Sequence, residues 1–204
     1  YSYIFNPRIR DAFFAKAGIE IQNCIIIIDE AHNLPNRARD QLSSKLTSAM
    51  LGRAKAEAKK FGYIETVGLL AQLETILEVL AKDVQVFKEH IVKQEDFVLK
   101  VKENIGYVQL QGDLDAIGEA IRETQQRSAV GGVAAFLDSW LGPNMGFARI
   151  ISRHPGSQGD VMALSYKCLD PSVITRDIIA ASHSTIAMSG TLTPMSMYKD
   201  VLGF

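Results

Sequence analysis

Ile25-Ile26-Ile27-Ile28-Asp29-Glu30-Ala31-His32 is the stretch that decides the fold. Its apolar, β-branched run has no polar alternation, which predicts a short strand buried on both faces, as in a parallel sheet. Pro35, two residues after Asn33, predicts that a helix begins directly after the acidic residues. A strand, an acidic turn and a helix in this order favour an α/β protein.

The two carboxylates at the end of this strand are the sharpest chemical signal. Ligands of open α/β sheets bind beyond the carboxyl ends of the strands. Adjacent carboxylates are costly there unless they meet a cation or hydrogen-bond donors, and Mg²⁺ takes one or two carboxylates together with phosphates and water. Asp29 could therefore hold Mg²⁺ through water, and Glu30 could orient or deprotonate an attacking water. The alternative is a pair of solvated acids at a helix start.

A second short apolar strand is expected at Thr185–Met188, followed by Ser189-Gly190-Thr191. We expect it beside the Ile25–Ile28 strand in one sheet, because both runs are apolar and end in polar residues. Hydroxyls at a strand end could exchange hydrogen bonds with His32 or a carboxylate. The alternative is an ordinary Ser-Gly-Thr turn.

A helical block is expected between these strands, from about Asn36 to Gly142. Within it, one helical pattern runs from about Leu34 to Gly62 and a longer one from about Glu65 to Ile91. The longer pattern carries a heptad-like seam, which fits either a coiled coil or an ordinary bundle helix. The seam residues are Leu73, Leu77, Leu80, Val84, Phe87 and Ile91. Two strands with a turn between them are expected at Phe147–Arg153 and Val161–Leu169.

The basic residues of the block are densest in one predicted helix. Arg53, Lys55, Lys59 and Lys60 could track phosphates of single-stranded DNA, because single-strand grooves are basic. Glu57 lies among them, so a solvated face is the alternative. With 22 basic and 23 acidic residues, the chain as a whole has no bulk positive field, and any nucleic-acid surface must be local.

Composition also bounds the class of protein. The two cysteines, Cys24 and Cys168, cannot build a four-thiolate cluster and predict free buried thiols in a reducing, intracellular compartment. No apolar run approaches the roughly 20 residues of a membrane helix. Both ends look cut: the chain begins at Tyr1 within an apolar stretch and stops at Phe204 after a helix-like segment.

Four segments together resemble the XPD (Rad3) family of superfamily 2 helicases. The string IIIIDEAHNL resembles the DEAH box, and residues 187–202 resemble the third helicase motif, with Ser-Gly-Thr-Leu followed by Pro and a Tyr-containing helix. Residues 168–172 resemble the Cys-x-Asp-x-Ser stretch before that motif. Residues 1–14 resemble the segment that leads into the DEAH box.

The resemblance implies an α/β fold, part of a RecA-like parallel-sheet motor domain with a helical Arch insertion. Residues 1–34 would belong to the first motor domain, 35–145 to the Arch, and 146–204 to a hairpin and the return to the motor domain. Asp29 would be the Mg²⁺ carboxylate and Glu30 the water-activating residue. The residues implied to couple hydrolysis to DNA movement are His32, Ser189, Gly190 and Thr191.

The same resemblance implies an ATP- and Mg²⁺-dependent helicase that moves 5′ to 3′ and acts in DNA repair or transcription. Its partners would be single-stranded DNA and duplex junctions, with repair or transcription factors binding through the Arch and no membrane. An iron–sulphur cluster would lie upstream of this chain, in a protein of the archaeal cytoplasm or the eukaryotic nucleus. The alternatives are another member of the same iron–sulphur family, or an Arch that serves mainly as a protein-docking module.

One departure limits what this chain can do alone. No Gly-x-x-x-x-Gly-Lys-Ser/Thr phosphate loop occurs in its 204 residues. The chain would thus hold only part of an ATP site, and we expect it to be inactive by itself.

Overall fold

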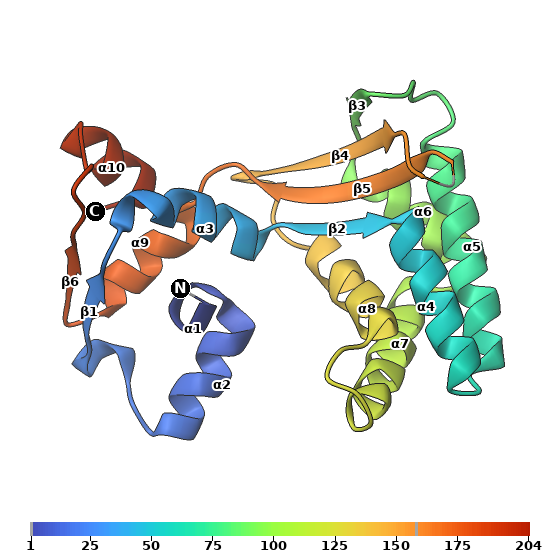
Figure 1. The fold of residues 1–204 in the computed structure, drawn as a ribbon, viewed down its shortest axis with the longest axis horizontal. Helices are drawn as coiled ribbons and strands as arrows, with labels where there is room; N and C mark the ends of the chain where they lie inside the picture. The colour runs from blue at the N-terminus through green and yellow to red at the C-terminus, as the bar shows by residue number, and fades with distance from the viewer. Residues whose placement is uncertain (1, 158) are drawn as a thin grey trace. The chain divides into compact units, whose positions relative to one another are not determined.

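The computed structural model describes residues 2–157 and 159–204, and the chain folds as two compact units (Figure 1). The first unit comprises Tyr1–Ser43, Met145–Phe147 and Lys167–Phe204. The second unit comprises Ser44–Asn144 and Ala148–Tyr166. None of the described helices is long and apolar enough to cross a bilayer.

The first unit contains a two-stranded parallel sheet and the helices around it. Strand β1 (Ile25–Ile28) pairs with β6 (Ser184–Ala187) in parallel, with Ile25 opposite Ser184 and Ile28 opposite Ala187. The expectation that these two runs share one sheet is confirmed. The helical elements of the unit are α1 (Ser2–Phe5), α2 (Pro7–Ala17), η1 (Ile21–Asn23), η2 (Ala31–Asn33), α3 (Leu34–Leu42), α9 (Ser172–Ala181) and α10 (Met195–Leu202).

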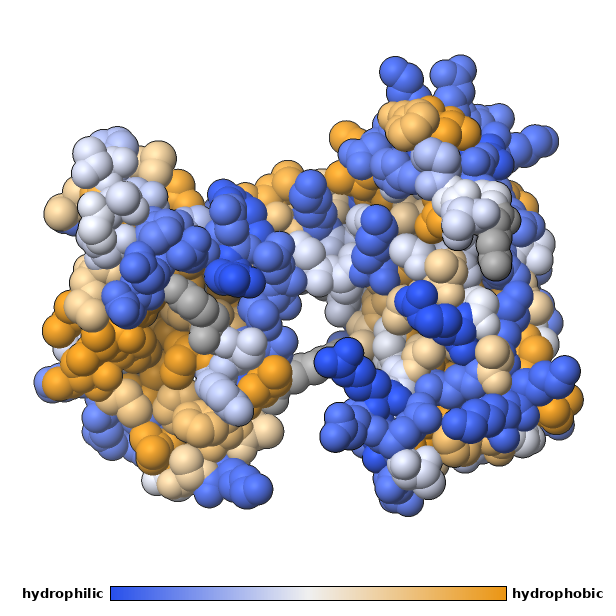
Figure 2. Space-filling view, in the orientation of Figure 1, coloured by the Kyte–Doolittle hydropathy of each residue, from blue (hydrophilic) through white to orange (hydrophobic). Residues whose placement is uncertain are grey.

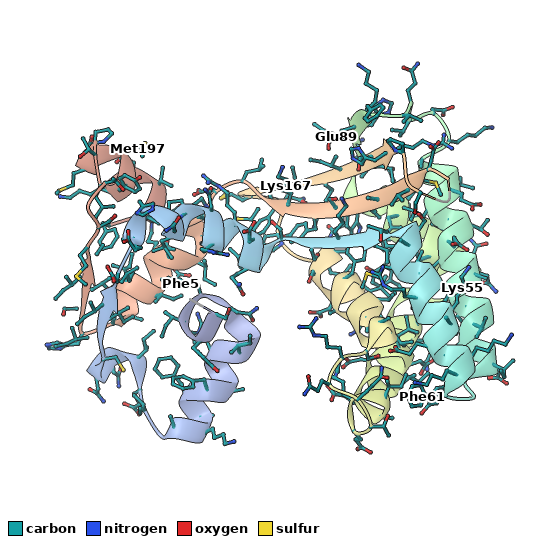
Figure 3. All side chains as sticks on the ribbon, viewed as in Figure 1. Phe5, Lys55, Phe61, Glu89, Lys167 and Met197 are labelled. Carbon is teal, nitrogen blue, oxygen red and sulfur yellow. The ribbon has the colours of Figure 1, made fainter. Side chains whose placement is uncertain are left out.

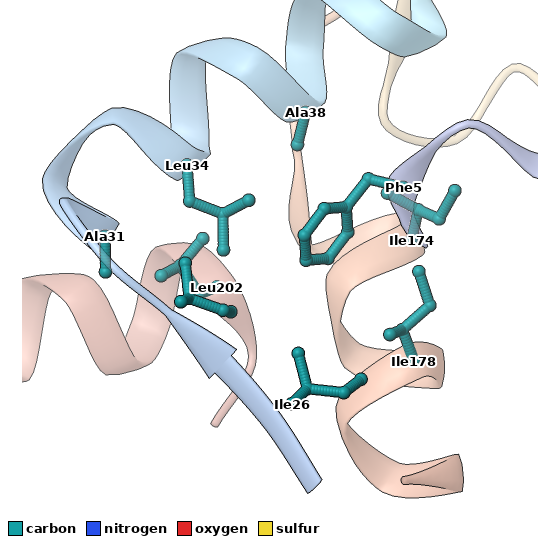
Figure 4. Packing of buried hydrophobic residues seen from close by; sticks show 9 residues of the cluster. Phe5, Ile26, Ala31, Leu34, Ala38, Ile174, Ile178 and Leu202 are labelled. Carbon is teal, nitrogen blue, oxygen red and sulfur yellow. The ribbon is translucent and has the colours of Figure 1, made fainter. Parts of the chain in front are cut away.

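The core of the first unit lies on one face of this sheet (Figure 4). Its buried residues come from five helical elements and from β1. They are Phe5, Ile26, Ile28, Ala31, Leu34, Ala38, Ile174, Ile178 and Leu202. Side chains alternate along a strand, so Ile25 and Ile27 point to the other face, where they stay 60% and 63% exposed. The expectation that both faces of β1 are buried is therefore wrong for this chain.

The second unit combines helices with a four-stranded sheet in the order β2-β5-β4-β3. Its helices are α4 (Ser48–Lys60), α5 (Ile64–Leu80), α6 (Gln94–Asn104), α7 (Tyr107–Arg122) and α8 (Ala129–Trp140). Its strands are β2 (Ser44–Thr47), β3 (Lys88–Ile91), β4 (Phe147–His154) and β5 (Val161–Cys168). Both β2 with β5 and β3 with β4 pair antiparallel.

Helices α7 and α8 cross at two glycines. A Cβ atom added to Gly118 would lie 2.4 Å from the Cα atom of Gly131, so the two backbones touch directly. At the far end of α8, the buried guanidinium of Arg149 donates to the carbonyls of Trp140 and Gly142 and lies over the Tyr166 ring. Burial lowers the pKa of Arg149. These contacts attach the C-terminus of α8 to the sheet.

Two predicted helices are shorter than expected, because strands of the sheet interrupt them. The Leu34–Gly62 pattern is broken by β2, in which Leu46 is fully buried opposite Leu164. The Glu65–Ile91 pattern ends with α5, and Phe87 then adopts a positive φ of 66° before β3. Phe87 and Ile91 of the proposed seam are 72% and 85% exposed. Pairing with β4 thus overrides the helical periodicity.

The two units also divide the chain differently from the expected boundaries of 1–34, 35–145 and 146–204. Helix α3 belongs to the first unit, where Leu34 and Ala38 pack into the core. Most of the β4–β5 hairpin belongs to the second unit, since its strands hydrogen-bond to β2 and β3.

Candidate functional site

The polar residues that follow β1 and β6 meet at one edge of the sheet. The N–H of Met188 donates to the carbonyl of Ile28 at 3.0 Å, and the N–H of Ala31 donates to the carbonyl of Met188 at 3.1 Å. These two backbone bonds extend the parallel pairing past the last residue of each strand. Parallel strands end at the same edge, so Asp29, Glu30 and Ser189 emerge together.

A tight turn then reverses the chain at Glu30. Its backbone is left-handed, with φ 51° and ψ 45°, a conformation that is uncommon for a residue other than glycine. The turn is held by the Glu30 N–H, which donates to Asp29 Oδ1 at 2.8 Å, and by the Asn33 N–H, which donates to the Glu30 carbonyl at 3.0 Å. His32, in the following 3₁₀ turn, is thereby brought back toward the Glu30 side chain.

Glu30, His32 and Ser189 form a closed triangle of polar atoms. His32 Nδ1 lies 2.7 Å from Ser189 Oγ and 3.1 Å from Glu30 Oε2. The Ser189 hydroxyl donates to the same Glu30 Oε2 at 3.3 Å. Thr191 adds its N–H, which donates to Ser189 Oγ at 3.3 Å. Residues 159 positions apart in the chain therefore share one hydrogen-bond network.

The donors of this network can be assigned consistently. Ser189 Oγ accepts from the Thr191 N–H, and its own hydrogen goes to Glu30. His32 can then donate from Nδ1 to either oxygen, since a neutral imidazole carries one N–H. The His32 and Glu30 side chains are 33% and 62% exposed, so the network is reachable from solvent.

The acidic edge fits Mg²⁺ held mainly by a nucleotide. No group of three or more His, Cys, Asp or Glu that could hold a metal occurs within residues 2–157 and 159–204. A Mg²⁺ ion at Asp29 would therefore draw its other ligands from phosphate oxygens and water, which is its usual mode in nucleotide sites. The single Asp29 carboxylate at a strand end is compatible with that donor set.

The remaining candidates around the site have more limited roles. Gly190 is exposed, and an added Cβ atom would meet no atom within 4 Å, so space alone does not require a glycine there. Sequence reasoning missed the backbone of Met188, which joins the two strand ends. No side-chain signal could have revealed it, because any residue offers the same N–H and carbonyl.

The two thiols lie apart from this chemistry. Cys168 is buried, and burial, followed by the nearby Asp170 carboxylate, raises its pKa. Cys24 is half-buried, so the expectation of a fully buried thiol holds for Cys168 alone.

The four basic candidates of α4 do not form a single stripe. A helix turns by about 100° per residue, so Arg53 and Lys60 share one side while Lys55 and Lys59 lie on another. Lys55 forms an ion pair with Glu74 of α5, and both side chains are about three-quarters buried (Figure 3). Lys60 lies over the ring of Phe61 at 5.2 Å. The structure thus separates Lys55, which has a partner within the unit, from the exposed Arg53, Lys59 and Lys60.

Comparisons with known proteins agree with this picture. The DEAD_2 family model matches residues 1–51. A Fanconi anemia group J protein homolog from Gallus gallus is 33% identical over 57 residues, which is 28% of this chain and 4% of that protein. The solved apo structure of XPD (XPD_APO) matches the whole chain with a TM-score of 0.62 at 22% identity, and the match covers 37% of that structure.

These matches carry different weights. At 22% identity, the likeness to the XPD structure establishes the fold. The DEAD_2 match covers the segment that contains Asp29, Glu30 and His32. The chain spans a small part of the length of both relatives. The DEAD_2 match over residues 1–51, the XPD-like fold and the DEAH turn at the end of β1 thus make this chain similar to part of an XPD (Rad3)-type superfamily 2 helicase.

Proposed function

We propose that the protein containing this chain is an ATP-dependent DNA helicase of the XPD type that moves 5′ to 3′ and acts in DNA repair or transcription. The observation that carries the proposal is the hydrogen-bond network of Glu30, His32 and Ser189 at the adjacent ends of β1 and β6. It joins the acidic turn of a nucleotide site to a segment that can move when the nucleotide changes.

The acidic turn supplies the chemistry of ATP hydrolysis. Asp29 holds Mg²⁺ through water, and Mg²⁺ neutralises charge on the phosphates during transfer. Glu30 orients the attacking water and accepts its proton. The left-handed turn at Glu30 supports this division, because the Glu30 N–H donates to Asp29 Oδ1 and fixes the Asp29 carboxylate relative to the Glu30 backbone.

The residues beyond β6 couple hydrolysis to movement along DNA. Ser189 and Thr191 hydrogen-bond to each other, and Ser189 bonds to both His32 and Glu30. A shift of the Glu30 carboxylate would therefore change the hydrogen bonds of Ser189 and, through them, the position of Thr191. Gly190, the residue between them, is exposed and has open space around it.

The second unit is the Arch, which bounds an opening for single-stranded DNA at duplex junctions. Its size and its position between the DEAH turn and the Ser189 segment support this assignment. The phosphate loop, the iron–sulphur domain and the second motor domain belong to the remainder of the protein. The share of the XPD structure that this chain leaves unmatched, beyond the 37% covered, has room for them.

Strand separation by the full-length protein tests the proposal. Duplexes with a 5′ tail should be unwound in the presence of ATP and Mg²⁺, and duplexes with a 3′ tail should not. Glu30→Gln should bind nucleotide but lose about 10²- to 10⁴-fold in hydrolysis, as removal of a general base does. Unwinding that starts from 3′ tails, or normal hydrolysis by Glu30→Gln, would contradict the proposal.

A protein-docking role for the Arch is the second candidate, and one feature favours it. Phe87 precedes the edge strand β3 and Ile91 is its last residue, and their side chains are 72% and 85% exposed. Figure 2 shows apolar surface where Figure 1 places β3. Loss of binding to repair or transcription factors on Phe87→Ser, with unwinding intact, would support docking. The match to the Fanconi anemia group J homolog keeps another member of the family as the third candidate.

A further inference from the structure

The Glu30 carboxylate is engaged in hydrogen bonds within the protein. Its Oε2 atom accepts a hydrogen bond from the Ser189 hydroxyl at 3.3 Å and lies 3.1 Å from His32 Nδ1. These two contacts hold the Glu30 carboxylate in one orientation, with Oε2 turned toward Ser189 and His32. A general base must lie within hydrogen-bond reach of the water that it deprotonates, so contacts that fix the orientation of this carboxylate also restrict which water it can reach.

Ser189 is held in place from the sheet side. The residue before it, Met188, is bonded to Ile28 of β1 through its N–H and to Ala31, in the turn that follows β1, through its carbonyl. The Ser189 Cα position is therefore fixed relative to Glu30, and the hydroxyl reaches Oε2 without movement of either strand.

On its other side, Ser189 depends on an exposed turn. The Thr191 N–H donates to Ser189 Oγ, and the Thr191 hydroxyl lies 3.5 Å from it. Gly190, Thr191, Thr193 and Pro194 are exposed. Anything that binds this turn and pulls Thr191 away removes a donor that orients the Ser189 hydroxyl toward Glu30.

We propose that Ser189 is a latch on Glu30, which holds its carboxylate in a low-turnover position until the 189–194 turn moves. The proposal rests on the role of Glu30 in ATP hydrolysis proposed above and adds a direction to the coupling. Ser189 is a positioning residue that restrains hydrolysis in the absence of DNA. Its release, when the turn is bound by another part of the motor or by DNA, lets Glu30 reach the attacking water.

The latch predicts an increase in activity on removal of a hydroxyl. In the full-length protein, Ser189→Ala should raise the DNA-free kcat for ATP by roughly 3- to 10-fold, the effect of one charge-assisted hydrogen bond reduced by solvent exposure. The KM for ATP should stay within about twofold, because Ser189 does not hold nucleotide. The stimulation of ATPase by single-stranded DNA should shrink by the same factor. Ser189→Thr keeps the hydroxyl and should restore the low DNA-free rate.

A matched control lies at the opposite end of β6. Ser182 also donates a side-chain hydrogen bond, and its hydroxyl lies near that of Thr185. It precedes β6, whereas Ser189, the residue that contacts Glu30, follows β6. Ser182→Ala should leave the DNA-free kcat unchanged. An equal rise in Ser182→Ala would mean that loosening of β6, and not release of Glu30, causes the effect, and would overturn the latch.

Glu30→Gln separates failure of the latch from failure of the proposed function. Normal hydrolysis by Glu30→Gln overturns the role of Glu30 itself. The latch alone is overturned if two results occur together: Glu30→Gln loses ATP hydrolysis, and Ser189→Ala has an unchanged or lower DNA-free kcat. The double variant should be as slow as Glu30→Gln, because Ser189 acts through that carboxylate.

Discussion

The carbonyl of Met188 accepts a hydrogen bond from the N–H of Ala31 at 3.1 Å, so the turn after β1 is bonded to the end of β6. This contact lies outside both strands, and it keeps the acidic turn and the Ser189 segment together whatever their side chains do. A shift of either segment would therefore disturb the other.

Loss of the Asp29 charge should alter the Mg²⁺ requirement of the full-length protein. Asp29→Asn weakens the anchoring of Mg²⁺, since an amide is a poorer ligand than a carboxylate for a hard cation. Half-maximal ATPase should move to about tenfold or higher Mg²⁺ concentration, with a lower maximal rate. Steady-state ATPase over a Mg²⁺ series measures the shift. Single-strand binding without nucleotide is the control and should be unchanged, and a normal Mg²⁺ dependence would remove Asp29 from the metal site.

A glycine at the crossing of α7 and α8 should be intolerant of even one methyl group. The Cβ atom of Gly118→Ala would meet the Gly131 backbone at 2.4 Å, so we expect about 1–3 kcal/mol of destabilisation from overpacking. Gly112→Ala is the matched control in the same helix, because its Cβ atom meets nothing within 4 Å. It should stabilise the chain by about 0.5–1 kcal/mol. Urea denaturation of the two variants compares them, and equal effects would contradict the close crossing.

Glu57 should make the second unit sensitive to acid. Although burial opposes its charge, hydrogen bonds from the Val130 N–H and the side chains of Ser128 and Gln125 lower the pKa of Glu57 below its usual 4.5. A lowered folded-state pKa contributes stability above the unfolded pKa, and this stability is lost as pH falls through the folded pKa.

Glu57→Gln should therefore destabilise the chain near pH 7 by about 1 kcal/mol, as expected for partly exposed hydrogen bonds to a charged group. The difference from wild type should shrink as pH falls below the unfolded pKa of Glu57 and through its lower folded pKa, because the wild-type carboxyl then becomes protonated. Thermal melts at several pH values measure it. Glu78→Gln, at an exposed site on α5, is the control and should show neither effect. A difference that stays constant with pH would show that shape, and not charge, is responsible.

The basic residues of α4 should act in DNA binding as two separate groups. If Arg53 and Lys60 contact phosphates, their joint replacement by Ala should reduce the slope of log K against log salt for single strands by about 1.4, roughly 0.7 for each charge. Lys55→Ala should instead lower stability, because it leaves Glu74 without its ion-pair partner. Filter binding over a salt series separates the groups. An unchanged slope for Arg53 and Lys60 would assign them to a solvated face.

The sequence by itself determined the local parts of this protein. Four β-branched residues followed by Asp29 and Glu30 specify a strand and an acidic turn, because these preferences act over a few residues. The apolar run before Ser189 specified the second strand in the same way. The candidate site could therefore be predicted, along with the pairing of its two strands.

Only the tertiary structure decided the rest. The helical period predicted one helix through Phe87 and Ile91, but pairing with β4 turned that segment into an edge strand, since backbone bonds between distant segments leave no local pattern. The exposure of Ile25 and Ile27 depends on which segments pack against β1, which its own residues do not encode. The triangle of Glu30, His32 and Ser189 likewise depends on the backbone bonds of Met188, which hold the ends of β1 and β6 together. Such bonds leave no signal in the sequence, because every residue except proline offers the same N–H and carbonyl.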